Sequence, residues 1–182
     1  MNNIRIIKTG IDVSKIVKQL EVYHTDWNHQ TKIEKAQSLV DRGYDALPTG
    51  VLQLVVGGVR RIEDFVGDSN INIPTPAFHR HTAVIEFLSR NFHNFCRCGF
   101  LSLEVGGEVG LHIDEGKYYK DKDRYHLSIL GKYEYTVGDE KVVIQPGTLM
   151  WFNNKLMHGA KNVGDCTRVT FVFDVPHNKS NP

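Results

Sequence analysis

The spacing of hydrophobic and polar residues changes near residue 96, from mixed helix and strand patterns to short alternating runs. Before that point, apolar residues recur at a roughly helical period over 11–22 and 81–95, which predicts two amphipathic helices. The other elements expected in this half are a helix over 32–41 that ends at Gly43, strands over 4–7 and 51–56, and a proline-containing loop over 68–76. The N-terminal half is therefore expected to be of mixed α/β type.

The C-terminal half alternates apolar and polar residues in short runs, which is the pattern of half-buried strands. Glycine and proline residues at turn positions separate these runs. The expected strands cover 100–105, 109–114, 125–130, 132–137, 141–145, 148–152 and 167–175. The charged segment 117–123 is expected to be an exposed loop. Many short strands with turns at this spacing predict an antiparallel sandwich or jelly roll.

Composition limits the classes of function that remain. The chain has 182 residues, of which 41% are hydrophobic and 24% charged, and this predicts a single soluble domain. We divide it into an α/β support over 1–95, which supplies part of the substrate wall, and a β core over 96–176 that carries the site. A net charge of +1 favours neither a nucleic acid nor a membrane surface as partner.

Two further features indicate the cellular compartment. The N-terminus lacks the apolar core of a signal peptide, and no stretch has the length of a membrane span. Cys96, Cys98 and Cys166 are odd in number and have no second ligand pair at zinc-site spacing. We therefore expect a cytoplasmic protein with reduced thiols, and we expect Cys96 and Cys98 to be ordinary strand residues.

Three side chains of the β core have the chemistry of metal ligands. His112 and Asp114 are two residues apart, so on a strand they point to the same face. His158 follows the turn after a later strand, where it has no evident packing role. Two imidazoles and one carboxylate on one face of a metal leave the opposite positions open, as in the facial triad of non-heme Fe(II) oxygenases.

A second set of polar residues is expected to line a cavity beside this triad. Arg168 alternates with apolar residues of its strand, and a buried arginine needs an anionic partner. A dicarboxylate supplies one, because guanidinium and carboxylate match in two parallel hydrogen bonds. Ser102, Arg124 and His126 are expected to line the same cavity, which would suit a metal-bound 2-oxo acid with a second carboxylate.

Taken together, these residues resemble a known family. The motifs are 102–107, His112, 124–127, Gly147, His158, Asn162, Arg168 and 173–175, and they stand in the order found in the aspartyl/asparaginyl β-hydroxylases. These are Fe(II)- and 2-oxoglutarate-dependent oxygenases. The resemblance implies a mainly β fold with flanking helices, built on a double-stranded β-helix of the jelly-roll, cupin-like kind.

The resemblance also implies roles for individual residues. His112 and His158 would bind iron. Ser102 and Arg168 would hold the distal carboxylate of 2-oxoglutarate, while Arg124 would lie near its metal-chelating end.

His126 would lie near that same chelating end. The chain departs from the animal members of the family at Asp114, where they have glycine, so this chain has the full triad. The insertion 117–123 is a second departure, expected at the mouth of the site.

The implied activity is hydroxylation of an unactivated C–H bond with Fe(II), 2-oxoglutarate and O2. The β-carbon of an Asp or Asn side chain in a protein or peptide is implied by the resemblance alone, and a small-molecule substrate fits the motifs equally well. The alternatives are a cupin-like zinc or manganese protein with hydrolytic or isomerising chemistry, a binding module with a degenerate pocket, and an oxygenase acting on a nucleobase. The last would use a local basic patch of Arg60, Arg61, Lys117, Lys120, Lys122 and Arg124.

Overall fold

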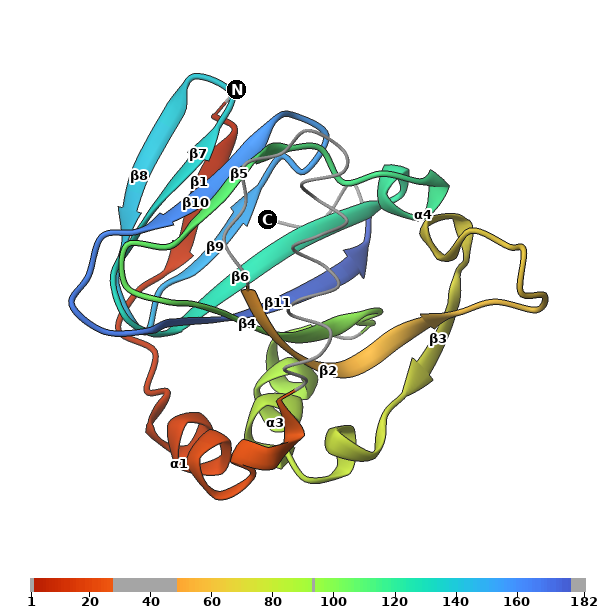
Figure 1. Ribbon diagram of the computed structural model, residues 1–182, viewed down its shortest axis with the longest axis horizontal. Coiled ribbons are helices and arrows are strands. Elements are labelled where there is room, and N and C mark those ends of the chain that lie inside the picture. The colour runs from red at the N-terminus through yellow and green to blue at the C-terminus, as the bar shows by residue number, and fades with distance from the viewer. Residues whose placement is uncertain (1, 28–48, 93, 178–182) are drawn as a thin grey trace.

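The protein consists of two antiparallel sheets that face each other, with helices against the outer face of the larger sheet (Figure 1). The computed structural model describes residues 2–27, 49–92 and 94–177. The strands are β1 (Ile4–Lys8), β2 (Thr49–Gly58), β3 (Ile71–Pro74), β4 (Cys98–Leu103), β5 (Glu108–His112), β6 (Lys122–Leu130), β7 (Tyr133–Val137), β8 (Glu140–Ile144), β9 (Leu149–Phe152), β10 (His158–Asn162) and β11 (Arg168–Pro176). The helices are α1 (Ser14–Val22), α3 (Thr82–Asn91) and α4 (Lys117–Lys120), with 3-10 turns η1 (His24–Asp26), η2 (Val66–Asp68) and η3 (Pro76–His79).

The order of strands identifies the architecture. The larger sheet runs β1-β9-β6-β11-β4-β2-β3 and the smaller sheet runs β5-β10-β7-β8. From β4 onward the chain crosses repeatedly between the sheets, and only β7 and β8 are consecutive strands of one sheet. This is a double-stranded β-helix, extended on one side by β1 and on the other by β2 and β3. The predicted fold class, mainly β with flanking helices, is confirmed.

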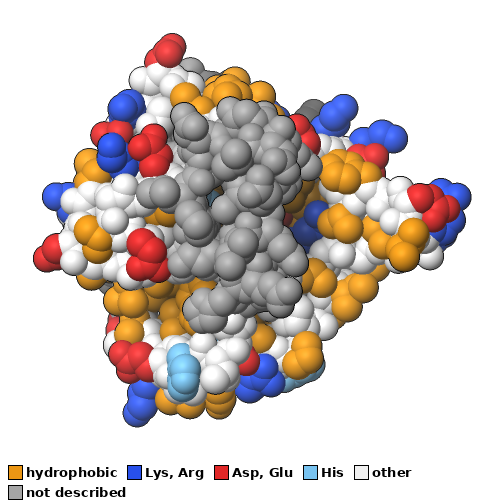
Figure 2. Space-filling view, viewed as in Figure 1, with side chains coloured by type: hydrophobic (Ala, Val, Ile, Leu, Met, Phe, Trp, Pro, Cys, Tyr) orange, Lys and Arg blue, Asp and Glu red, His pale blue; other side chains and the backbone are white. Residues whose placement is uncertain are grey.

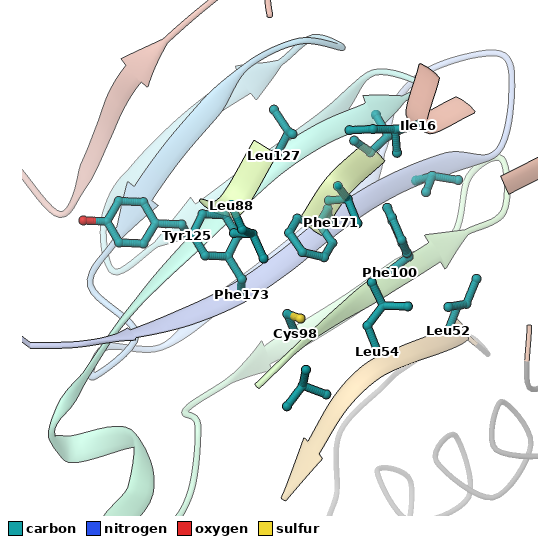
Figure 3. Close-up of a cluster of buried hydrophobic side chains, with 14 of the residues drawn as sticks. Ile16, Leu52, Leu54, Leu88, Cys98, Phe100, Tyr125, Leu127, Phe171 and Phe173 are labelled. Atoms are coloured by element: carbon teal, nitrogen blue, oxygen red, sulfur yellow. The ribbon is translucent and has the colours of Figure 1, made fainter. Parts of the chain in front are cut away.

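The central strands of the larger sheet, β6, β11 and β4, are covered on both faces. Apolar side chains of β4, β6 and β11, such as Phe100, Leu127 and Phe171, pack against α1 and α3 (Figure 3). Because successive strand residues point to opposite faces, the residues between them face the smaller sheet. A second apolar cluster there includes Tyr135 and Phe152. The space between the sheets is where the expected polar residues meet.

Two of the expected loops are wrong. The segment 68–76 contains strand β3, whose four residues are all exposed; it lacks the alternating pattern because pairing with β2, and not burial, holds it in place. The segment 117–123 begins as α4 and continues into β6. Tyr118 is fully buried there, with the Arg97 guanidinium 3.8 Å above its ring.

Several element boundaries also differ from expectation. The helix expected over 81–95 spans Thr82–Asn91, and β10 was not expected at all, because its glycine and alanine break the hydrophobic alternation. The helix expected over 32–41 lies outside the described residues. The three cysteines are free; Cys98 begins β4 as expected, whereas Cys96 is buried in the segment before that strand. Among the described residues no helix is long and apolar enough to span a membrane.

Candidate metal site

Three predicted ligand residues meet at one end of the space between the sheets. His112 ends β5 and His158 begins β10, and the two are paired across these neighbouring strands. Asp114 reaches them from the loop just beyond the end of β5, so the strand expected over 109–114 ends two residues earlier than predicted. One ligand atom from each residue lies within 4.8 Å of the other two. The side chains are therefore close enough to share one metal ion.

Backbone carbonyls orient both imidazoles. The Nδ1 atom of His112 lies 2.9 Å from the carbonyl oxygen of Gly110, and that of His158 lies 2.9 Å from the carbonyl oxygen of Leu156. A carbonyl only accepts hydrogen bonds, so each Nδ1 carries the proton and each Nε2 presents a lone pair. Such outer contacts fix the tautomer that a metal ligand needs. Burial lowers the pKa of His158 to about 4, with Asp114 opposing and His112 adding to that effect.

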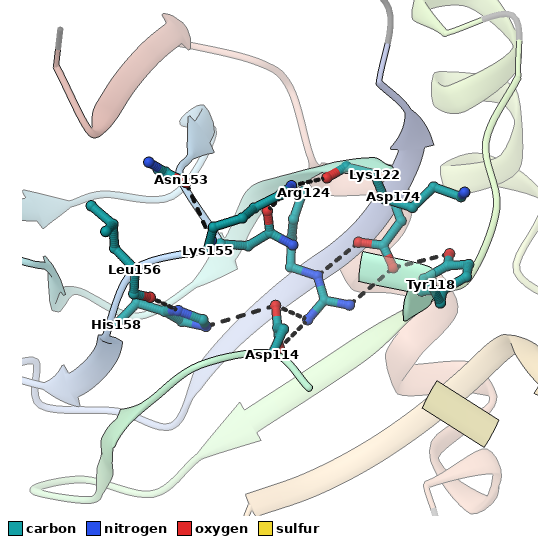
Figure 4. A network of polar contacts seen from close by, with 10 residues as sticks. Asp114, Tyr118, Lys122, Arg124, Asn153, Lys155, Leu156, His158 and Asp174 are labelled. Carbon is teal, nitrogen blue, oxygen red and sulfur yellow. Dashed lines mark hydrogen bonds and ion pairs between the residues drawn. The ribbon is translucent and has the colours of Figure 1, made fainter. Parts of the chain in front are cut away.

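Arg124 connects Asp114 to the sheet behind it (Figure 4). Its Nε and one terminal nitrogen donate to the two oxygens of Asp174 at 2.7 and 2.9 Å. Its other terminal nitrogen lies 2.9 Å from both carboxylate oxygens of Asp114. Tyr118 donates from its hydroxyl to Asp174 at 3.2 Å. The polar groups at this end of the site are thus held in a continuous chain of charge-assisted hydrogen bonds.

The opposite end of the site has buried polar groups without partners. Arg168 is 2% exposed, and no carboxylate of the described residues lies within ion-pair distance of its guanidinium, which sits 4.4 Å from the ring centre of Tyr133. Four other buried atoms between the sheets have no hydrogen-bond partner in the described part of the chain: Tyr133 Oη, Thr170 Oγ1, Ser128 Oγ and His126 Nδ1. Orphaned buried polar atoms are rare in native structures and require an explanation.

A cavity of about 60 Å³ lies between the two ends. Of the residues singled out from the sequence, it is lined by His112, Arg124, His126, His158 and Arg168. Pairing of β6 with β11 places Arg124, His126, Ser128, Thr170 and Arg168 on one face, as their alternation in the sequence predicts. Burial, followed by the charges of Arg168 and Arg124, holds the pKa of His126 well below its usual range, so this imidazole is neutral.

Ser102 is not part of this cavity, and that expectation is wrong. It pairs across the sheet with Val169 and shares a face with Phe100, both of which belong to the core beneath the helices. The Ser102 side chain points toward Gly50, its partner on β2: a Cβ atom on that glycine would lie 2.2 Å from the Ser102 hydroxyl oxygen. Leu101, one residue earlier, lines the cavity instead. The sequence offers one signal for this register: Phe100, a large apolar residue two positions earlier on the same strand, must point to the same face as Ser102.

Two positions important to the geometry were not assigned a role from the sequence. Tyr133 stands at the start of β7, where its alternation with Tyr135 and Val137 marks an inward face. Asp174 lies near the end of β11, on the face that points toward the smaller sheet. Its pairing with Arg124 follows only from the fact that β11 and β6 are neighbours.

Comparison with protein families identifies the family to which this chain belongs. A family model described as Aspartyl/Asparaginyl beta-hydroxylase matches residues 72–178, which is more than half of the chain. The chain belongs to this family. The match in this hydroxylase-family protein runs from β3 to the end of β11 and includes every candidate site residue. No curated protein matches it in sequence.

Solved structures similar to this aspartyl/asparaginyl hydroxylase-family chain include cupins. A predicted oxalate decarboxylase from Thermotoga maritima is 17% identical, with 50% of this chain and 74% of that one covered at a TM-score of 0.39. The Cnp3 cupin domain of Schizosaccharomyces pombe is 14% identical, with 48% and 59% covered at 0.40. A cupin protein from Bacteroides fragilis is 15% identical, with 47% and 70% covered at 0.40. At this level of similarity they carry no information on activity.

Proposed function

We propose that this protein is an Fe(II)- and 2-oxoglutarate-dependent oxygenase that hydroxylates an unactivated C–H bond. The observation that carries the proposal is the buried guanidinium of Arg168, which has no carboxylate partner in the described part of the chain and lies on the same cavity as two histidines of a possible metal site. Membership of the hydroxylase family supplies the identity of the metal and of the co-substrate.

The donor set fits ferrous iron. Two imidazole nitrogens, from His112 and His158, and one carboxylate, from Asp114, make a face of three ligands and leave room for a chelating co-substrate and dioxygen. When bound, iron with 2-oxoglutarate supplies the activation of dioxygen for attack on a C–H bond. The chain itself fixes the tautomer of the two histidines and the position of the carboxylate.

The unpaired end of the cavity fits the distal carboxylate of 2-oxoglutarate. Arg168 would bind it, since a guanidinium and a carboxylate neutralise each other in two parallel hydrogen bonds. The hydroxyls of Thr170, Ser128 and Tyr133 would donate to it, which gives three orphaned atoms a partner. We place these hydroxyls in the role that the family resemblance implied for Ser102. His126, neutral and next to the metal end, stays a candidate contact for the other end of the co-substrate.

The cavity must enlarge to admit this co-substrate. Its volume of about 60 Å³ is well below the roughly 300–1,000 Å³ of typical ligand pockets. Leu101, Tyr135 and Phe152 form apolar walls beside the polar ends, and we propose that these side chains move apart when 2-oxoglutarate binds. Once closed around it, they keep water from the reacting groups.

The substrate would approach beside the arm formed by β2 and β3. Asp68 in this arm accepts a hydrogen bond of 2.8 Å from the backbone N–H of Lys117, three residues beyond Asp114. The arm carries six exposed apolar side chains: Val59, Ile62, Phe65, Val66, Ile71 and Ile73. Figure 2 shows hydrophobic side chains over this part of the molecule, at the right of the view. This placement supports a role of the N-terminal half in the substrate wall. We propose an Asp or Asn side chain of a protein or peptide as substrate on the basis of family membership.

An anaerobic titration of the Fe(II)-loaded protein with 2-oxoglutarate tests the proposal. Chelation of iron by the co-substrate gives a visible charge-transfer band, which we expect to appear and saturate. Arg168→Gln should weaken 2-oxoglutarate binding by about 10–100-fold, because one charged hydrogen-bonded contact is lost, and leave Fe(II) affinity unchanged. Absence of the band in the wild-type protein would leave a cupin-type metal protein with other chemistry.

A further inference from the structure

We propose that Arg124 acts on the metal ligand Asp114 and not on the co-substrate. It is a positioning residue, anchored by Asp174, that holds the Asp114 carboxylate against the two histidines. The family resemblance instead implies a place for Arg124 near the chelating end of 2-oxoglutarate. The inference rests on the proposed function only for the identity of the metal and the co-substrate.

The hydrogen bonds of the guanidinium carry this assignment. Each of its three nitrogens already has a carboxylate partner: Nε and one terminal nitrogen bind Asp174, and the other terminal nitrogen binds Asp114. Arg168 is 2% exposed on the same cavity and has no such partner among the residues that the structure describes. Of these two arginines, Arg168 is therefore the one available to bind a ligand carboxylate, whereas Arg124 binds carboxylates of the protein itself.

Asp114 is the ligand that needs external support. The two histidines belong to strands and are locked by their own backbone contacts, whereas Asp114 lies in the loop after β5 and is followed two residues later by Gly116 with φ of 106°. Its side chain is 10% exposed, and its Oδ2 lies 3.8 Å from His158 Nε2. A bond from Arg124 selects one rotamer of this carboxylate and so lowers the entropy lost on metal binding.

Asp174 connects this support to the rigid part of the fold. Arg124 and Asp174 are directly paired on adjacent strands β6 and β11, in the middle of the larger sheet. Asp174 is 1% exposed and also accepts from the Tyr118 hydroxyl. The loop carboxylate is thus fixed to the sheet through one arginine, and substitution at either anchor should loosen the metal site without touching a metal ligand.

Calorimetric titration under anaerobic conditions separates the two roles, with Fe(II) added to metal-free protein and 2-oxoglutarate added to metal-saturated protein. Arg124→Gln and Asp174→Asn should each weaken Fe(II) binding by about 10–100-fold, the usual cost of losing a residue behind a metal ligand. Their 2-oxoglutarate affinity should stay within about threefold of wild type, since no contact with the co-substrate is removed. Arg124→Lys should lie between, because one ammonium cannot replace the fork that spans two carboxylates.

A double-mutant cycle excludes general damage to the fold. In an Asp114→Asn background, Arg124→Gln should cause no further loss of Fe(II) affinity, because it acts through the carboxylate that is already gone. Arg90→Gln is the matched control, since this exposed arginine pairs with Glu86 on α3 and should change neither affinity.

Two outcomes would overturn the inference. If Arg124→Gln kept wild-type Fe(II) affinity and lost 2-oxoglutarate binding, Arg124 would be a co-substrate ligand, while the proposed function would stand. Additive losses in the cycle would show that the arginine acts independently of Asp114. A wild-type protein that binds Fe(II) but not 2-oxoglutarate would instead refute the proposed function, and the Fe(II) titrations would still decide the role of Arg124.

Discussion

The two ends of the cavity use the same kind of residue in opposite ways. At the metal end, Arg124 is bound by two carboxylates, and the neighbouring histidines are fixed by backbone carbonyls. At the other end, the Arg168 guanidinium lies against a tyrosine ring and has no carboxylate partner among the described residues, although it is even more buried than Arg124. The first end is assembled before any ligand arrives, whereas the second end is incomplete without one.

The difference separates the energetic contributions of the two arginines. A buried ion pair that is broken leaves an uncompensated charge, so both partners depend on each other for stability. A buried cation with no partner already bears that cost in the free protein, and a bound dicarboxylate removes it. Stability is therefore expected to be concentrated at the metal end, and ligand-binding energy at the other end.

A matched pair of substitutions tests this contrast most strongly. Arg124→Met should lower the free energy of unfolding by about 3–5 kcal/mol, because Asp114 and Asp174 lose their common counter-charge. Arg168→Met should raise it by about 1 kcal/mol, because an unpaired buried cation is replaced by an apolar side chain of similar length. Urea denaturation of the metal-free variants measures both values.

The sign of the two effects decides the outcome. If Arg168→Met destabilised the protein as much as Arg124→Met does, then Arg168 would be paired in the free protein and its role as a ligand anchor would lose its basis. Arg90→Gln, on the exposed face of α3, serves here too and should change the free energy of unfolding by less than about 0.5 kcal/mol.

The metal end should also carry a pH-dependent part of the stability. The native pKa of His158 is about 4, below the 6.5 expected in the unfolded chain. Above pH 6.5 the imidazole is neutral in both states; as the pH falls from 6.5 to 4, only the unfolded state gains the proton. The native state should therefore lose up to about 3 kcal/mol over this window in chelator-treated protein.

His158→Gln isolates this contribution, because glutamine does not titrate. Urea denaturation at pH 7 and pH 4.5 should show a smaller loss of stability in the variant than in the wild type. The other titrating groups are present in both proteins, so the difference between the two pH profiles reports the contribution of His158. Parallel pH profiles would show that His158 is protonated in the native state and is not held as a neutral ligand.

Much of this arrangement could be predicted from the sequence, because the period-two alternation of a strand determines which side chains share a face of the sheet. It placed Arg168 opposite the apolar core residues of its strand, and it grouped Arg124 with His126 on one face of another strand. The prediction failed at Ser102, because this residue shares a face with the phenylalanine two positions earlier, and that face is covered by the helices. A shift of one residue moves a side chain to the other face, so a motif alone does not set the register.

What the sequence did not reveal was the partnership between strands distant in the chain. Asp174 and Arg124 are 50 residues apart, and their ion pair depends on β6 and β11 being neighbours. The orphaned state of Arg168 is likewise a property of the assembled interior, because it depends on which carboxylates do not come near. Pairing between segments is set by tertiary structure, whereas alternation is local.

The hydroxyl of Thr170 gives the smallest and most specific test of the unpaired end. Thr170→Val keeps the shape of the side chain and removes one buried hydroxyl that has no hydrogen-bond partner among the described residues. Without a ligand, the variant should be as stable as the wild type or more stable, by less than about 1 kcal/mol, because no hydrogen bond is lost. In the metal-loaded protein, 2-oxoglutarate should bind about threefold to tenfold more weakly, since one donor to its distal carboxylate is missing.

Ser89→Ala on α3 is the control. It removes a hydroxyl that donates to a backbone carbonyl far from the cavity, so co-substrate affinity should not change. A Thr170→Val protein that binds 2-oxoglutarate as tightly as the wild type would remove this hydroxyl from the proposed anchor and leave Arg168 to hold the carboxylate with other partners.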